Sequence, residues 1–108
     1  MHKTFESILL DAIQTHKDRG AVYGDNYLEQ HGKVMAALFP LGLQLIGAED
    51  FNRFGTLNMI VSKLTRYANN LRKDNTHIDS LHDMGVYSFM LEEVDRMWLD
   101  EHEKQIEE

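Results

Sequence analysis

Two carboxylates in the stretch THIDSLHDMGVYSFML, residues 76–91, have the types and spacing that could do chemistry. Asp79 and Asp83 lie four residues apart, so on a helix they share one face. At about 100° per residue, Asp83 falls near the middle of the apolar arc of that helix, and Asp79 falls within the arc one turn earlier. The arc contains Val86, Tyr87, Met90, Leu91, Val94, Met97 and Trp98. Inward carboxylates can pair with a cation, accept hydrogen bonds from a ligand or coordinate a metal ion.

Each carboxylate also has a structural explanation. If Thr76 is the N-cap, Asp79 is the third helical residue, where a carboxylate favours the free amides and the helix dipole. Asp83 lies too far along the helix for that role. A buried carboxylate is costly unless it is paired, hydrogen-bonded or bound to metal. We therefore expect Asp83 to form a structural ion pair or hydrogen bond, or to belong to a ligand or metal site.

Four helices are predicted to position these acids, at about residues 4–20, 26–39, 50–72 and 77–106. Thr4 can cap the first helix and Gly20 can end it, while Asn26 and Glu29 form a capping box for the second. Pro40 stops the second helix. Short turns after the first and third helices favour antiparallel neighbours. The prediction is a single all-α domain spanning 1–108, folded as a four-helix up-and-down bundle.

In such a bundle, polar residues from all four helices meet at one pole, which suggests a pocket. The residues that we expect to bind a ligand there are Arg19, Tyr23, Gly24, His31, Lys63, Arg66, Tyr67, His77, Asp79 and Asp83. The opposite pole, around FPLGLQLIG, is almost purely apolar.

Several of these residues also have simpler explanations. His31, like His16, can be a hydrogen-bonded core histidine, and Gly24 can serve a turn that needs positive φ. Arg66 lies almost opposite the apolar stripe of its helix. It would therefore be solvated in a monomer, and it reaches a site only if a second subunit covers the face that carries Met59.

Composition limits the classes of function. The net charge of -7 argues against a binder of duplex nucleic acid or of an anionic membrane, which would need a basic surface. The chain has no cysteine, which excludes disulfides and thiolate metal sites. The apolar run in the opening MHKTFESILL is too short and too interrupted for a secretion signal. No window of the sequence has the apolar length of a membrane span. We expect a cytoplasmic protein.

Three segments carry a resemblance to a known group of proteins. RGAVYGD (residues 19–25), KLTR (63–66) and HIDSLHDMGVY (77–87) resemble small phage and prophage proteins of unknown function. Those proteins are loosely related to the all-α NTP pyrophosphatases, the MazG-like and dimeric dUTPase group. The resemblance spans residues 19 to 90. It implies a MazG-like helical bundle, a homodimer or larger homo-oligomer, that binds nucleotides at its helix ends in the host cytoplasm.

The chain departs from that group at the metal site. The active pyrophosphatases hold Mg²⁺ with two acidic pairs, of which Asp79 and Asp83 resemble the second, spaced i, i+4 instead of i, i+3. Where the first pair would be, this chain has Lys63 and Arg66, which bind phosphate instead of metal. This exchange favours binding over hydrolysis.

Three functions follow as hypotheses. In the first, the chain binds a phosphorylated nucleotide or nucleotide signal without a cofactor and without catalytic residues. Arg19, Lys63 and Arg66 then contact phosphate, Tyr23 or Tyr67 stacks on a base, and the acids orient the cations; the resemblance suggests a sponge that sequesters a host defence signal. In the second, it is a Mg²⁺-dependent nucleoside triphosphate pyrophosphatase with Asp79 and Asp83 as metal ligands. In the third, it is a non-enzymatic assembly or inhibitor protein whose ion pairs are structural.

Overall fold

The computed structural model describes residues 3–23 and 30–107, with side chains described within 3–20 and 30–103. These residues form helices α1 (Phe5–Tyr23), α3 (His31–Leu38), α4 (Gly47–Arg72) and α5 (Ile78–Glu107), and the described part contains no strand. The all-α prediction is confirmed. The helix bounds agree with those expected within about three residues, except that the described part of the second helix begins at His31. Asn26 and Glu29, its predicted capping box, lie outside the described residues.

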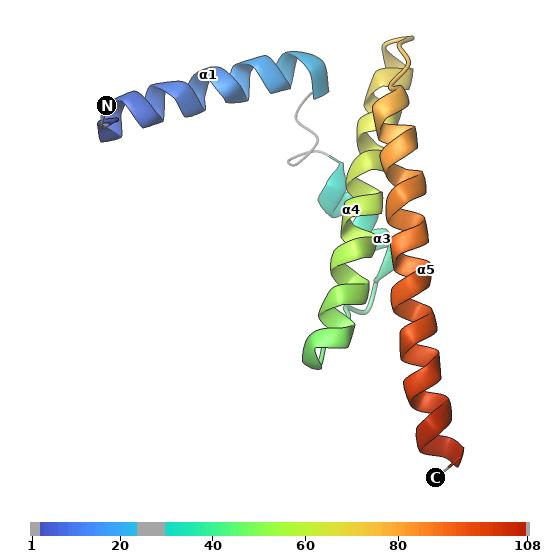
Figure 1. Ribbon diagram of the computed structural model, residues 1–108. Coiled ribbons are helices and arrows are strands. Elements are labelled where there is room, and N and C mark those ends of the chain that lie inside the picture. The colour runs from blue at the N-terminus through green and yellow to red at the C-terminus, as the bar shows by residue number, and fades with distance from the viewer. Residues whose placement is uncertain (1–2, 24–29, 108) are drawn as a thin grey trace.

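The centre of the fold is the antiparallel hairpin of α4 and α5, which lie side by side along most of α4 (Figure 1). The turn between them begins at Lys73, whose backbone N–H donates to the carbonyl of Asn70, 3.1 Å away. Asp74 has a φ of 58°, in the left-handed region that ends many helices and that Asp tolerates better than most residues. The short turn therefore reverses the chain directly, as predicted from KDNT.

Two ion pairs cross the hairpin. Nε of Arg53 on α4 lies 2.9 Å from a carboxylate oxygen of Asp95 on α5, and Nζ of Lys63 lies 3.1 Å from a carboxylate oxygen of Asp83. The two cations are about 15 Å apart along α4 at 1.5 Å per residue. Because both pairs require nearly the same alignment of the two helices, a slip of one helical turn would break both.

The short helix α3 and the following loop pack on α4. A ring nitrogen of His31 is hydrogen-bonded to the amide oxygen of Asn58 at 2.6 Å. The rings of Phe39 and Phe54 are 6.3 Å apart in a tilted arrangement. Pro40 follows the end of α3, as expected. The loop 39–46 then leads back to α4, where the backbone N–H of Ile46 donates to the carboxylate of Asp50 at 2.9 Å.

Helix α1 does not lie along the hairpin. It approaches α4 with its C-terminal end, while its N-terminal part lies far from α4 and α5 (Figure 1). The predicted cap is present, because the hydroxyl of Thr4 accepts the N–H of Ser7 at 3.2 Å. Gly20 does not end the helix, which continues to Tyr23. The single chain therefore has the expected helices but does not close them into an up-and-down bundle.

The open arrangement leaves a thin interior. Among the described side chains, Val61 is the one apolar side chain that is almost fully buried, with 3% of its surface exposed. The other buried side chains are polar: Thr65, Asn70 and Ser80. In the part of the chain that the structure describes, every helix is too short or too polar to cross a lipid bilayer.

We predict that Val61→Ala lowers stability by about 2 kcal/mol. The change removes two buried carbon atoms, worth about 0.8 kcal/mol each, and leaves a small cavity. Thermal unfolding at fixed protein concentration should show a melting temperature several degrees lower. Leu41→Ala is the control, because Leu41 is 99% exposed. Equal effects of the two changes would contradict this assignment of the core.

Candidate functional site

The predicted polar residues of α4 and α5 lie at one end of the hairpin. We call the last turns of α4 and the first turns of α5 the hairpin end; it carries Lys63, Arg66, Tyr67, His77, Asp79 and Asp83. Their positions follow from the antiparallel register, since residues before and after the same turn must lie near each other. This part of the predicted pole is therefore built by two helices that the structure places in direct contact.

Lys63 and Asp83 form the central contact of the hairpin end. The Lys63 side chain is 14% exposed and that of Asp83 is 40% exposed, with 3.1 Å between ammonium and carboxylate. The pair satisfies the charge of Asp83, which is the structural explanation considered above. Lys63, Arg66 and Asn70 recur at i, i+3 and i+7, so they share one face of α4.

His77 lies at the N-cap position of α5. The helix begins at Ile78, so His77 and not Thr76 precedes it. Nδ1 of His77 is hydrogen-bonded to the hydroxyl of Ser80, and the Ser80 N–H donates to the His77 carbonyl at 3.2 Å. Asp79 lies exposed in the first turn of α5, where its charge favours the free amides.

The buried polar side chains nearby are satisfied within α4, with one exception. The Thr65 hydroxyl donates to the Ser62 carbonyl at 2.9 Å, and the Asn70 amide donates to the Arg66 carbonyl at 2.9 Å. Nδ2 of Asn69 is buried and has no hydrogen-bond partner in the structure. An unsatisfied buried donor is costly to the stability of the folded chain.

Arg66 differs from its predicted environment. It is half-buried in the single chain and interacts with other groups, whereas we expected it to be solvated without a second subunit. The physical reason is that α4 is covered on more than one side. α5 contacts the face that carries Lys63, and α3 contacts the face that carries Asn58.

Other predicted site residues do not join this cluster. His31 contacts Asn58, five positions before Lys63 on α4, so the two α4 side chains point about 140° apart. Arg19 is exposed on α1. The side chain of Tyr23 and the whole of Gly24 lie outside what the structure describes.

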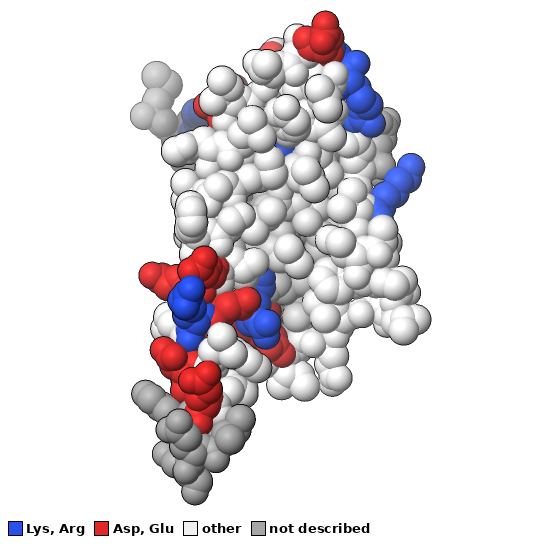
Figure 2. All heavy atoms as spheres, turned by 90° about the vertical axis from the view of Figure 1, so that its right-hand side faces the viewer, with Lys and Arg blue, Asp and Glu red and all other residues white. Residues whose placement is uncertain are grey.

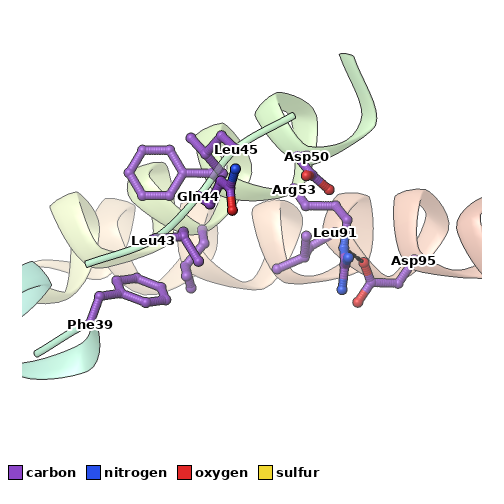
Figure 3. A pocket seen from close by; sticks show the side chains of 10 residues that line it. Phe39, Leu43, Gln44, Leu45, Asp50, Arg53, Leu91 and Asp95 are labelled. Atoms are coloured by element: carbon purple, nitrogen blue, oxygen red, sulfur yellow. Dashed lines mark hydrogen bonds and ion pairs between the residues drawn. The ribbon is translucent and has the colours of Figure 1, made fainter. Parts of the chain in front are cut away.

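A pocket that the sequence did not predict lies near the N-terminal end of α4, away from the hairpin end. It has a volume of about 280 Å³ and lies between the loop 39–46, the first half of α4 and the middle of α5 (Figure 3). Its lining residues are Phe39, Leu43, Gln44, Leu45, Asp50, Arg53, Phe54, Leu57, Leu91 and Asp95. The pole that we expected to be almost purely apolar therefore contains charged side chains.

Arg53 and Asp95, two of the charged residues that line the pocket, form an ion pair. Arg53 reaches from α4 to Asp95 on α5 (Figure 3), and its guanidinium lies 5.0 Å from the centroid of the Trp98 ring. The sequence held a signal for this contact, because Arg53 lies four residues before Leu57 and so continues the apolar stripe of α4. The contacts of Arg53 account for its partial burial without a ligand.

Two acids meet where α4 begins and α5 approaches its end. A hydrogen bond with the carboxyl of Glu101, followed by desolvation and repulsion from Glu101, raises the pKa of Glu49. Proton uptake by Glu49 is therefore favoured in the folded chain, and the two acids repel when both are charged. These acids do not form a metal centre: among the described residues, no group of three or more His, Asp or Glu side chains could hold an ion.

Comparisons with protein-family models, with curated proteins and with solved structures found no match to this chain. The resemblance to phage proteins and MazG-like pyrophosphatases stays a prediction.

We predict that Lys63 and Asp83 are energetically coupled. Asp83→Asn should lower stability by about 1–2 kcal/mol, because it leaves a largely buried ammonium without its carboxylate. In a double-mutant cycle with Lys63→Met, chemical denaturation should give a coupling of about 1 kcal/mol. The exposed pair of Glu92 and Arg96, 2.8 Å apart within α5, is the control and should show a smaller coupling. Additive effects of Asp83→Asn and Lys63→Met would be inconsistent with this contact.

We predict that Glu49→Gln raises the melting temperature at neutral pH. Because the pKa of Glu49 is raised in the folded state, the folded chain binds more protons than the unfolded chain. Wild-type stability should therefore fall as pH rises above the ordinary value of 4.5. Glutamine keeps a donor for Glu101 without the charge, so its advantage should shrink as pH is lowered toward 4.5. Melting curves across this range test the sign. Glu103→Gln, an exposed change on α5, should not show this trend.

Proposed function

We propose that the chain binds a small phosphorylated ligand of the nucleotide class at the hairpin end, without turning it over. The observation that carries the proposal is the Lys63–Asp83 pair, in which a carboxylate holds a largely buried ammonium in place. An oriented ammonium forms charge-assisted hydrogen bonds with phosphate oxygens at little entropic cost. Arg66 on the same face of α4 supplies the second cation.

Two cations lie close together in this acidic chain. The chain as a whole carries a net charge of -7, yet Lys63 and Arg66 lie within one turn of each other. Tyr67 is half-buried beside them and offers an aromatic face for a base. Asp83 would keep its contact with Lys63, and Asp79 is exposed and able to accept from ligand hydroxyls.

Hydrolysis has less support from the same residues. A two-metal pyrophosphatase site needs several carboxylates around the phosphates. Here Asp83 is already paired with Lys63, and Asp79 stands exposed on the first turn of α5. The donor set of this chain therefore does not fit Mg²⁺ held by one subunit.

The finer parts of the proposal rest on the resemblance. They are a MazG-like bundle, assembly as a homo-oligomer and a phage role in sequestering a nucleotide signal from host defence. Retention of intact ligand would be the useful property of such a protein. The sequestering role therefore requires binding without turnover.

We predict that at least one compound in a panel of nucleotides raises the melting temperature of the wild-type protein. This stabilisation should depend on Lys63. Loss of a charge-assisted hydrogen bond in Lys63→Gln should weaken that ligand about ten- to a hundredfold. Lys33→Gln, the same change at an exposed site on α3, should leave affinity unchanged. Chromatography after heating should return the ligand intact.

Two results would contradict this function. Mg²⁺-dependent conversion of a triphosphate to a monophosphate, lost in Asp83→Asn, would establish the pyrophosphatase alternative. Absence of any stabilising nucleotide would favour the assembly or inhibitor alternative, in which the Lys63–Asp83 pair is structural alone.

A further inference from the structure

The chain exposes far more surface than a folded monomer of its size. Its accessible surface is 8580 Å², whereas a compact protein of 12.6 kDa exposes about 6,200 Å². Its radius of gyration is 18.4 Å, against about 13 Å for a compact chain of this length. Each chain therefore carries an excess of about 2,400 Å², within the range that obligate homodimers bury in total.

Much of the excess lies on α1. The apolar side chains of this helix are 42% to 74% exposed: Phe5, Ile8, Leu9, Leu10 and Ile13. Phe5, Leu9, Ala12 and His16 recur at helical spacing and form one stripe, beside which Ile8 and Ile13 lie. Most helices of this length owe their stability to packing of the apolar face, so this stripe requires a partner surface.

The hairpin offers an exposed apolar surface of similar length. Leu57 on α4 and Leu91 on α5 are two walls of the pocket under the loop 39–46. Leu64 and Leu71 follow Leu57 at heptad spacing, so they continue the α4 wall toward the turn, beyond the loop.

On α5, Met84 and Leu81 continue the wall from Leu91, at seven and ten residues before it. Leu64, Leu71 and Leu81 are each about half exposed. We call this apolar surface, which runs from the pocket along α4 and α5, the hairpin groove. From Leu57 to Leu71 the groove extends about 21 Å along α4, and the stripe of α1 from Phe5 to His16 is about 17 Å long.

Charge does not oppose a protein partner on this part of the molecule. On this side of the molecule charged side chains lie at the end with the hairpin turn and toward the C-terminal part of α5, whereas the region between them shows few (Figure 2). Ile78, Val86 and Phe89 are exposed apolar residues of α5. An apolar surface beside the groove would enlarge the area that an assembled form buries.

We infer that α1 of one copy docks in the hairpin groove of a second copy, so that two chains complete each other's bundle by exchanging their first helices. The occupant is a second copy of this chain because the exposed stripe and the exposed groove belong to the same sequence. Their lengths agree, and the excess surface is sufficient for a stable homodimer. This inference is independent of the proposed ligand.

Light scattering coupled to gel filtration tests the assembly. The wild-type protein should have at least twice the 12.6 kDa mass of one chain. Leu9→Glu places a charge at the centre of the stripe and should weaken self-association at least about tenfold. Gln14→Glu introduces the same charge about 140° around α1 and should leave the mass unchanged. A monomeric wild type, or equal effects of both changes, would overturn the inference.

Cysteine pairs test the exchange itself, and the chain has no cysteine of its own to interfere. A chain with Leu9→Cys and a chain with Leu64→Cys, mixed after mild dissociation, should form a disulfide-linked heterodimer on oxidation. Gln14→Cys mixed with Leu64→Cys should not. If Leu9→Cys and Leu64→Cys link only within a chain that carries both, α1 folds back on its own hairpin and the exchange is wrong. Equal linking by the control pair would equally overturn it.

Discussion

The antiparallel alignment of α4 and α5 is the constraint on which the other features depend. Two cation–carboxylate contacts, Arg53–Asp95 and Lys63–Asp83, cross the hairpin about 15 Å apart and demand nearly one register. Each contact is partly exposed and contributes only modestly to stability. Together they exclude shifted alignments, since a slip of one turn would leave four charged groups unpaired. The same register brings Leu57 opposite Leu91 in the pocket and gathers the polar residues at the hairpin end.

The interior that this register creates is small and polar. Thr65, Asn70 and Ser80 are more typical of a helix surface, and each is satisfied by a neighbour in its own chain segment. Such bonds prevent a penalty but add little net stability. Val61 alone cannot offset the conformational entropy lost by four helices. The stabilising apolar surface is present in the sequence, on α1 and along the hairpin groove, and it remains exposed in the single chain.

The sequence predicted those features that depend on local chemistry. The helices, the Thr4 cap, the turn at Lys73 and the inward pairing of Asp83 follow from spacing, capping and the cost of a buried charge. It could not predict where α1 lies, because periodicity identifies an apolar face and not the surface that covers it. The burial of Arg66 was missed since a single stripe cannot represent a helix covered on two sides. Arg53 was overlooked because its long side chain joins Asp95, which lies off the apolar arc of α5.

The candidate ligand site and the hairpin groove are physically linked. Lys63 and Leu64 are consecutive on α4, so the ammonium that faces Asp83 and a leucine of the groove belong to one helical turn. An interaction that holds this turn of α4 in place therefore favours both ligand binding at Lys63 and docking of a helix against Leu64. A ligand bound to the hairpin end would stabilise the alignment of α4 and α5 that forms the groove walls, and a helix docked in the groove would reduce the motion of Lys63. By linkage, each event then strengthens the other by the same factor. Binding should accordingly depend on protein concentration, and it should be tighter at concentrations at which the chains are assembled.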